Sequence, residues 1–252
     1  MWAERELLLT LARKEFFVKY RRASFGVLWA VGLPTIQAVV LIAIFSRVVR
    51  VETGVDYIVF VFSGMAAWSY FSSTMPAAST AVVDNSGLAS KIYFPRAVLP
   101  LITIGANLYG FVVTLAILVG MCVFHLKHVG VEILLLVPGT LLLVLLTTGM
   151  ALLNSALHVY FRDLRFIIQA TLMAWFYITP IFYPARLATG VLHTVIMVNP
   201  ITGVVELMRA ATVGADTALG TSVAITAAWA LAALAGGLFA HRRYDRLFTD
   251  LL

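Results

Sequence analysis

Long runs that contain no charged residue constrain this chain more than any other feature of its sequence. Seven stretches lack Asp, Glu, Lys and Arg altogether, and they cover residues 23–46, 57–83, 97–126, 133–161, 166–185, 187–205 and 217–240. Each is long enough to be considered as a helix of about 20 residues that crosses a hydrocarbon layer roughly 30 Å thick. Only 12% of the residues are charged, whereas about 25% is usual for a soluble domain. The pattern predicts an all-α integral membrane protein with one transmembrane domain over residues 1–252.

The sixth stretch, residues 187–205, decides between two topologies. It contains the pair Asn199-Pro200, which favours a break in the chain over the middle of a lipid-facing helix. Seven spans would place the two ends of the chain on opposite sides of the membrane, and six would place them on the same side. With six spans, 13 of the 18 basic residues lie on the side of the termini, and such an excess marks the cytoplasmic side. We therefore predict six transmembrane helices with both termini in the cytoplasm.

Under this topology, residues 185–213 form a broken hairpin at the outer face. Asn199 and Pro200 divide it into two short pieces, and we expect Glu206 and Arg209, three residues apart, to form an exposed ion pair on the second piece. A conduit wide enough for a large substrate must be closed at rest, and helices at its outer mouth are well placed to close it. Asn199, Pro200, Glu206 and Arg209 are therefore candidate outer-gate residues.

A polar segment from Asp84 to Arg96 separates the second and third predicted spans. Asp84 and Asn85 are residues that often start helices, and Pro95 disfavours helix at the residue before it, so the segment has room for about two helical turns. Such a helix, with Lys91 directed outward and Tyr93 and Phe94 available for packing, suits docking into a cleft on another protein. The alternative is an ordinary solvated loop.

The N-terminal segment, residues 4–22, combines six basic residues with apolar side chains. Leu9, Ala12, Phe16 and Tyr20 follow one helical stripe, but other apolar residues fall outside it. The segment is predicted to be an interfacial helix between lipid headgroups and a protein neighbour, or simply an anchor on the membrane lipids.

Several kinds of chemistry have no signature in this sequence. None of the four lysines follows a glycine, so the G-x-x-x-x-G-K-[ST] nucleotide-binding loop does not occur. The five histidines are scattered, which disfavours a metal site, and there is no basic patch with aromatic residues that would favour nucleic acid. The assigned spans contain no acidic or basic residue, which disfavours an ion-coupled carrier. His158 with Asp163 is the single candidate pair for an enzyme, and we predict no catalytic role and no bound cofactor.

Aromatic residues gather in the second and fifth predicted spans. Packing and belts at the membrane interface are the ordinary explanation for such residues. The alternative is that some of them face a wide conduit, where aromatic ring faces can hold sugar rings weakly and let a chain slide.

Six blocks of sequence, in order along the chain, resemble a known family. They are R-K-E-F-F-V-K-Y-R-R-A-S-F-G-V-L-W-A (13–30), S-G-M-A-A-W-S-Y-F (63–71), S-K-I-Y-F-P-R-A-V-L-P (90–100), Y-F-R-D-L-R (160–165), T-P-I-F-Y-P (179–184) and N-P-I-T (199–202). Together they resemble the membrane (permease) subunit of bacterial polysaccharide-exporting ABC transporters of the O-antigen and teichoic-acid type. The Lys14-Glu15 pair departs slightly from the family pattern, which often ends in Asp.

The resemblance implies a permease in the inner (cytoplasmic) membrane that exports a lipid-linked polysaccharide. It implies a dimer of two copies of this chain and two copies of a separate ABC ATPase, which binds the ATP and Mg. By the same resemblance, residues 84–95 are the coupling helix, residues 4–22 also touch the ATPase, and residues 185–213 gate the outer mouth. The first and fifth spans would line the conduit, with Trp29, Phe176 and Tyr177 near its path. A permease for a smaller hydrophobic or lipid substrate, and an ion-coupled carrier acting alone, are the alternatives.

Overall fold

The computed structural model describes residues 2–21, 23–46, 53–85, 95–126, 130–214 and 219–244, and its regular elements within these ranges are helices. The helices are α1 (Trp2–Tyr20), α2 (Trp29–Ile44), α3 (Tyr57–Asp84), α5 (Val98–Met121), α6 (Leu136–Tyr160), α7 (Leu164–Ile178), α8 (Gly190–Val198), α9 (Thr202–Thr212) and α10 (Leu219–Tyr244). Shorter helical turns lie at Gly26–Leu28, Cys122–Leu126, Val131–Leu135 and Ala185–Leu187. The predicted all-α fold is confirmed.

Five helices in the described ranges are long and apolar enough to cross a membrane. They cover Gly26–Ile44, Tyr57–Asp84, Val98–Leu126, Val131–Tyr160 and Leu219–Arg243, and they coincide with five of the six predicted spans. The fifth predicted span differs, because α7 ends at Ile178 and not near Pro184. At 1.5 Å per residue its 15 residues reach only about 22 Å. Residues 179–184 continue without helical structure.

Helix α3 lies at the centre of the bundle. Of its most apolar window 78% is buried inside the protein, against 11% for the first span and 17% for α10. It contacts α5, α6 and α9 along much of its length. Two buried serines hydrogen-bond within the helix: the Ser63 hydroxyl donates to the Phe60 carbonyl at 2.9 Å, and that of Ser79 donates to the Met75 carbonyl at 2.6 Å. These polar residues can therefore be buried at little cost.

Helices α6 and α10 approach each other closely through glycines. A Cβ atom at Gly149 would lie 2.5 Å from the backbone nitrogen of Leu234, and one at Gly237 would lie 2.7 Å from Cβ of Leu152. Small residues of this kind let membrane helices pack backbone to backbone. The last span is thereby fixed against the fourth.

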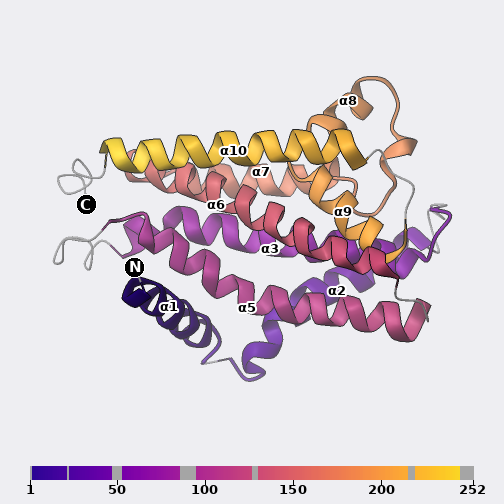
Figure 1. Ribbon diagram of the computed structural model, residues 1–252, viewed down its shortest axis with the longest axis horizontal. Coiled ribbons are helices and arrows are strands. Elements are labelled where there is room, and N and C mark those ends of the chain that lie inside the picture. Colours follow the sequence, from indigo (N-terminus) through magenta and orange to yellow (C-terminus); the bar gives the residue numbers. More distant parts are fainter. Residues whose placement is uncertain are drawn as a thin grey trace.

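The two ends of the bundle carry different elements. Helix α1, the end of α3 and the end of α10 lie at one end, and α8 and α9 lie at the other (Figure 1). Helix α1 packs against α5, where Ala12 and Phe16 are buried with Ile102 and Ala106. Leu9, which the sequence placed on the same apolar stripe, is 64% exposed. The stripe therefore packs from Ala12 to Tyr20, and its first residue is exposed.

The predicted hairpin is broken as expected, but its second half is internal. Helices α8 and α9 meet at an angle of 84° around Asn199 and Pro200. Residues 202–211 of α9 are all buried, because the helix packs against α3, α6 and α10. Glu206 and Arg209 are therefore a buried pair, and the prediction that this pair is exposed is wrong.

Candidate functional site

An open groove runs between α2 and α7, with α3 as its floor. Its volume is about 580 Å³. Its polar side chains are Gln37 from α2, Ser72 from α3 and Gln169 from α7. Gln37 and Gln169 are the only two glutamines in the whole sequence. We call this surface the α2–α7 groove.

Aromatic rings form the second part of the groove lining. Trp68 of α3 is 5% exposed and lies behind Phe176, with the ring centroids 5.6 Å apart. Phe176 packs edge-on against Tyr177 at 5.3 Å, and Tyr177 is 62% exposed. A buried ring and a half-buried ring thus hold an exposed ring at the surface of the groove. Amide groups and ring faces together can bind a molecule that has both hydroxyl groups and apolar faces.

A second pocket of about 310 Å³ adjoins the groove on the other side of α2. It shares Gln37 and Ser72 with the groove and is also lined by Trp29, Lys19 and Asn107. Lys19 of α1 donates to the Asn107 side chain at 3.1 Å. Burial lowers the pKa of Lys19 from its ordinary value, and the nearby Glu15 carboxylate partly offsets this shift. We call it the Lys19 pocket.

The three predicted conduit residues are thus divided between two places. Phe176 and Tyr177 lie together in the α2–α7 groove, whereas Trp29 lines the Lys19 pocket and packs edge-on against Phe25 at 5.9 Å. The sequence analysis did not select Gln37 and Gln169. Both could have been selected from the sequence, because a polar side chain inside an apolar span costs free energy and is usually retained for a function.

Buried polar side chains fix the segment that follows α7. The Asn199 amide oxygen accepts hydrogen bonds from Trp175 Nε1 at 2.8 Å and from the Ile201 backbone nitrogen at 3.1 Å. Its amide nitrogen donates to the Thr179 hydroxyl at 3.1 Å. Asn199 is only 5% exposed. This predicted gate residue therefore ties the α8–α9 break to the end of α7.

Arg209 fixes the same segment from α9. Its Nη2 donates to the backbone carbonyls of Pro180 and Ile181, the latter at 2.7 Å. Its guanidinium lies over the ring of Phe60 at 3.6 Å from the centroid, and its Nη1 is 3.7 Å from Glu206. These carbonyl groups have no partner within α7 because the helix has already ended, so the arginine supplies the missing donors. We call the contacts of Asn199 and Arg209 the α7–α9 clamp.

The predicted coupling segment is only partly described. Asp84 is the last residue of α3, and the Asn85 side chain donates back to the Ala81 carbonyl at 2.8 Å. Both residues therefore act at the end of α3, where the sequence suggested a helix start. The Pro95 carbonyl accepts from the Val98 nitrogen at 3.0 Å before α5 begins. Lys91, Tyr93 and Phe94 lie outside the described residues.

Metal binding finds no support in the part of the chain that the structure describes. No group of three or more His, Cys, Asp or Glu side chains there is arranged to hold a metal ion.

Comparisons with known proteins agree with this architecture. Residues 6–213 match the model of a family described as ABC-2 type transporter. The O-antigen export system permease protein RfbA of Myxococcus xanthus is 29% identical over 184 residues, which are 73% of this chain and 70% of that protein. A protein of the same name from Klebsiella pneumoniae is 29% identical over 208 residues, 81% of this chain and 79% of that protein. The polysialic acid transport protein KpsM of Escherichia coli is 24% identical over 242 residues, 94% of this chain and 93% of that protein.

Proposed function

Because this chain belongs to the ABC-2 type transporter family as its membrane component, we propose that it is the permease subunit that exports a lipid-linked polysaccharide across the cytoplasmic membrane. The resemblance stated from the sequence blocks is confirmed at the level of the family. The names of the relatives support the cargo, since O-antigen and polysialic acid are both polysaccharides.

The composition of the α2–α7 groove carries this proposal. Both glutamines of the chain line it, beside Ser72 and the exposed ring of Tyr177. Polar groups are expensive to present to lipid, so their concentration in one open groove favours a polar cargo over hydrocarbon. A sugar chain offers hydroxyl groups to the amides and apolar ring faces to the aromatic side chains. A small lipid would need few of these groups.

The proposed transporter contains two copies of this chain and two copies of a separate ABC ATPase. The groove is open along one side, and α2 exposes Leu33, Ile36 and Val39 beside it. A second copy placed against α2 and α7 would close the two grooves into one conduit. In this assembly ATP and Mg bind to the ATPase, and this chain contributes transport but no catalysis.

Coupling to the ATPase is assigned to residues 84–95, with support from α1, which lies at the end of the bundle where α3 ends (Figure 1). Replacing Tyr93 and Phe94 together by Ala removes the bulky groups that would fill a cleft on the partner, and interface anchors of this kind contribute about 2 kcal/mol or more. Export should fall while the protein still inserts and folds. Phe161→Ala is the matched control, because Phe161 is an exposed aromatic residue before α7. Undiminished export by the double variant would remove the segment from the mechanism.

The outer-gate role is assigned to α8. The four residues predicted for the gate hold this helix in place. Asn199, Glu206 and Arg209 are buried, so they anchor the gate and do not face the mouth. Pro200 sets the angle between α8 and α9. Helix α8 exposes Val191 at 81% and Leu192 at 52%, and these side chains are the ones free to move across an opening.

Export by intact cells tests the proposed function. Deletion of the gene for this chain should abolish the polysaccharide on the cell surface and leave the polysaccharide inside the cell. Complementation with the gene should restore the surface polysaccharide. An unchanged surface polysaccharide, with loss of a small lipid instead, would replace the polysaccharide by that lipid as the cargo.

A further inference from the structure

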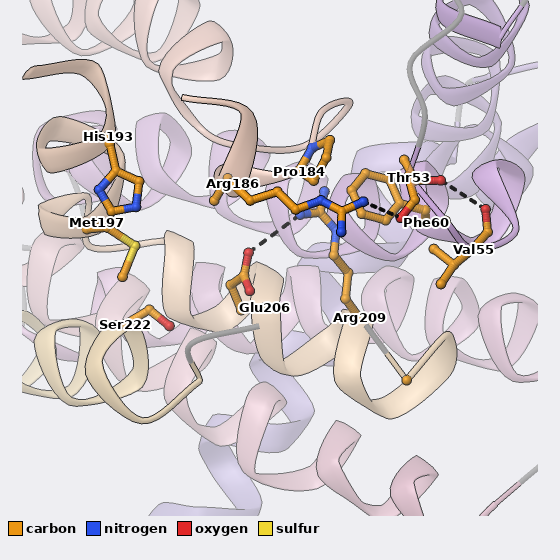
Figure 2. Close-up of a pocket in the computed structure, with 13 residues that line it drawn as sticks. Thr53, Val55, Phe60, Pro184, Arg186, His193, Met197, Glu206, Arg209 and Ser222 are labelled. Atoms are coloured by element: carbon orange, nitrogen blue, oxygen red, sulfur yellow. Dashed lines mark hydrogen bonds and ion pairs between the residues drawn. The ribbon is translucent and has the colours of Figure 1, made fainter. Parts of the chain in front are cut away.

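A charged pocket lies at the α8–α9 end of the bundle, apart from the α2–α7 groove. Its volume is about 360 Å³. Residues from several parts of the chain line it, among them Thr53 before α3, Arg186 after α7, His193 of α8, and Glu206 and Arg209 of α9. Figure 2 shows Arg186, Glu206 and Arg209 directed toward the centre of the pocket. We call it the Arg186 pocket.

Arg209 forms the buried floor of this pocket. Only 1% of its side chain is exposed, and Glu206 beside it is 6% exposed. Its Nη2 is used by the α7–α9 clamp, but its Nε has no hydrogen-bond partner in the part of the chain that the structure describes. Nε is enclosed by protein atoms, so Arg209 acts on the pocket through its positive charge and not through this donor.

Arg186 provides an exposed cation above this floor. One nitrogen, Nη2, donates to the Thr53 carbonyl at 3.0 Å, which fixes the direction of the side chain. A guanidinium carries five N–H donors, and this is the one hydrogen bond of Arg186 among the residues that the structure describes. His193 adds a ring nitrogen from α8. Glu206 is the sole acidic residue among the described residues that line the pocket, so two arginines exceed one carboxylate and the pocket is net positive.

Part of the remaining wall of the pocket is apolar. Pro184 and Met197 line it beside the charged groups. The pocket also lies where predicted spans end, since it is bordered by residues that follow α2 and α7. The ends of membrane spans lie near the lipid headgroups, so a site here suits a headgroup ligand.

We propose that the Arg186 pocket binds a phosphate group, supplied either by a phospholipid headgroup or by a soluble phosphate. Guanidinium groups suit phosphate because their fork of donors matches two phosphate oxygens at once. The apolar wall suits the glycerol and first acyl carbons of a lipid. The site does not depend on which cargo passes through the α2–α7 groove, so failure of one proposal leaves the other standing.

The test measures ligand binding to the full chain purified in detergent. The probes are short-chain dihexanoyl phosphatidic acid, inorganic phosphate, and dihexanoyl glycerol, which has the same acyl chains without the phosphate. We expect saturable binding of at least one phosphate probe and none of dihexanoyl glycerol. Arg186→Gln should weaken that binding about tenfold or more, since it removes a charge-assisted hydrogen bond. Arg186→Lys should restore it in part, because the charge returns without the fork.

Arg162→Gln is the matched control, because it removes the same charge from an exposed site at the opposite end of the bundle. It should bind as the unchanged protein does. Tighter binding of phosphatidic acid than of inorganic phosphate would assign the site to a lipid headgroup, and equal binding would assign it to a soluble anion. The proposal is overturned if no phosphate probe saturates, if dihexanoyl glycerol binds equally well, or if Arg186→Gln and Arg162→Gln have the same affinity.

Discussion

At the residue scale, the buried polar contacts at the end of α7 determine how the outer part of the bundle is held. Asn199 and Arg209 together bind the Thr179 hydroxyl and the carbonyls of Pro180 and Ile181. A chain segment inside a membrane protein must have its polar groups satisfied, and residues 179–184 have no helix to do so. These side chains therefore replace the hydrogen bonds that a longer α7 would have made.

The first prediction concerns Asn199→Ala. This change leaves the Trp175 indole N–H and the Ile201 backbone N–H without an acceptor, at about 1–3 kcal/mol each. Thermal unfolding in detergent should show a clear loss of stability. Asn154→Ala is the matched control, because among the described residues the Asn154 amide makes a single hydrogen bond, a weak one to Met75 Sδ at 4.0 Å. Equal losses for the two variants would contradict the clamp.

The second prediction concerns the buried ion pair. Arg209→Met removes the cation beside Glu206 and the donors to two carbonyl groups, and breaking a buried pair costs about 3–5 kcal/mol. Glu206→Gln removes the negative charge that faces Arg209, so the double variant should lose less than the sum of the two single variants. The free energies of unfolding of the single and double variants form a cycle that measures this coupling. If the two losses simply add, the pair does not stabilise the fold.

At the element scale, the sequence predicts most of the spanning helices and misses what depends on tertiary contacts. Charge-free runs mark α2, α3, α5, α6 and α10, because only an apolar helix of this length suits a bilayer. The early end of α7 and the burial of α9 were not predicted. Both depend on donors such as Arg209, which lies about thirty residues further along the chain and whose position no local pattern reveals. The groove was missed in part for the same reason, since Gln37 and Gln169 meet only in the folded bundle.

The third prediction tests how α10 is fixed against α6. Gly237→Ala places a methyl group 2.7 Å from Cβ of Leu152 and should cost about 1–3 kcal/mol through overpacking. The neighbouring Gly236→Ala meets nothing closer than 3.8 Å and should gain about 0.5–1 kcal/mol of helix propensity. Unfolding temperatures of the two variants in detergent should shift in opposite directions. A shift of both in the same direction would contradict the close α6–α10 packing.

At the scale of the whole molecule, the distribution of charge agrees with the arrangement of the helices. Helix α1, the end of α3 and the end of α10 lie at one end of the bundle, and the predicted cytoplasmic side carries 13 of the 18 basic residues (Figure 1).

The fourth prediction follows from this asymmetry of basic residues. A reporter fused after Leu252 should read as cytoplasmic, and a fusion inside residues 188–192 should read as external. A periplasmic signal from the first fusion would overturn the six-span topology.

The proposed function requires that a polysaccharide passes along the α2–α7 groove. Photo-crosslinking in exporting cells tests this claim most directly. The photoreactive p-benzoylphenylalanine is placed at Tyr177 in the groove or at Leu141 on α6, because the two side chains are exposed to a similar degree, 62% and 65%. The account predicts polysaccharide attached to the protein at Tyr177 and none at Leu141, with the attachment dependent on active export. Equal labelling at both positions, or labelling at Leu141 alone, would contradict it.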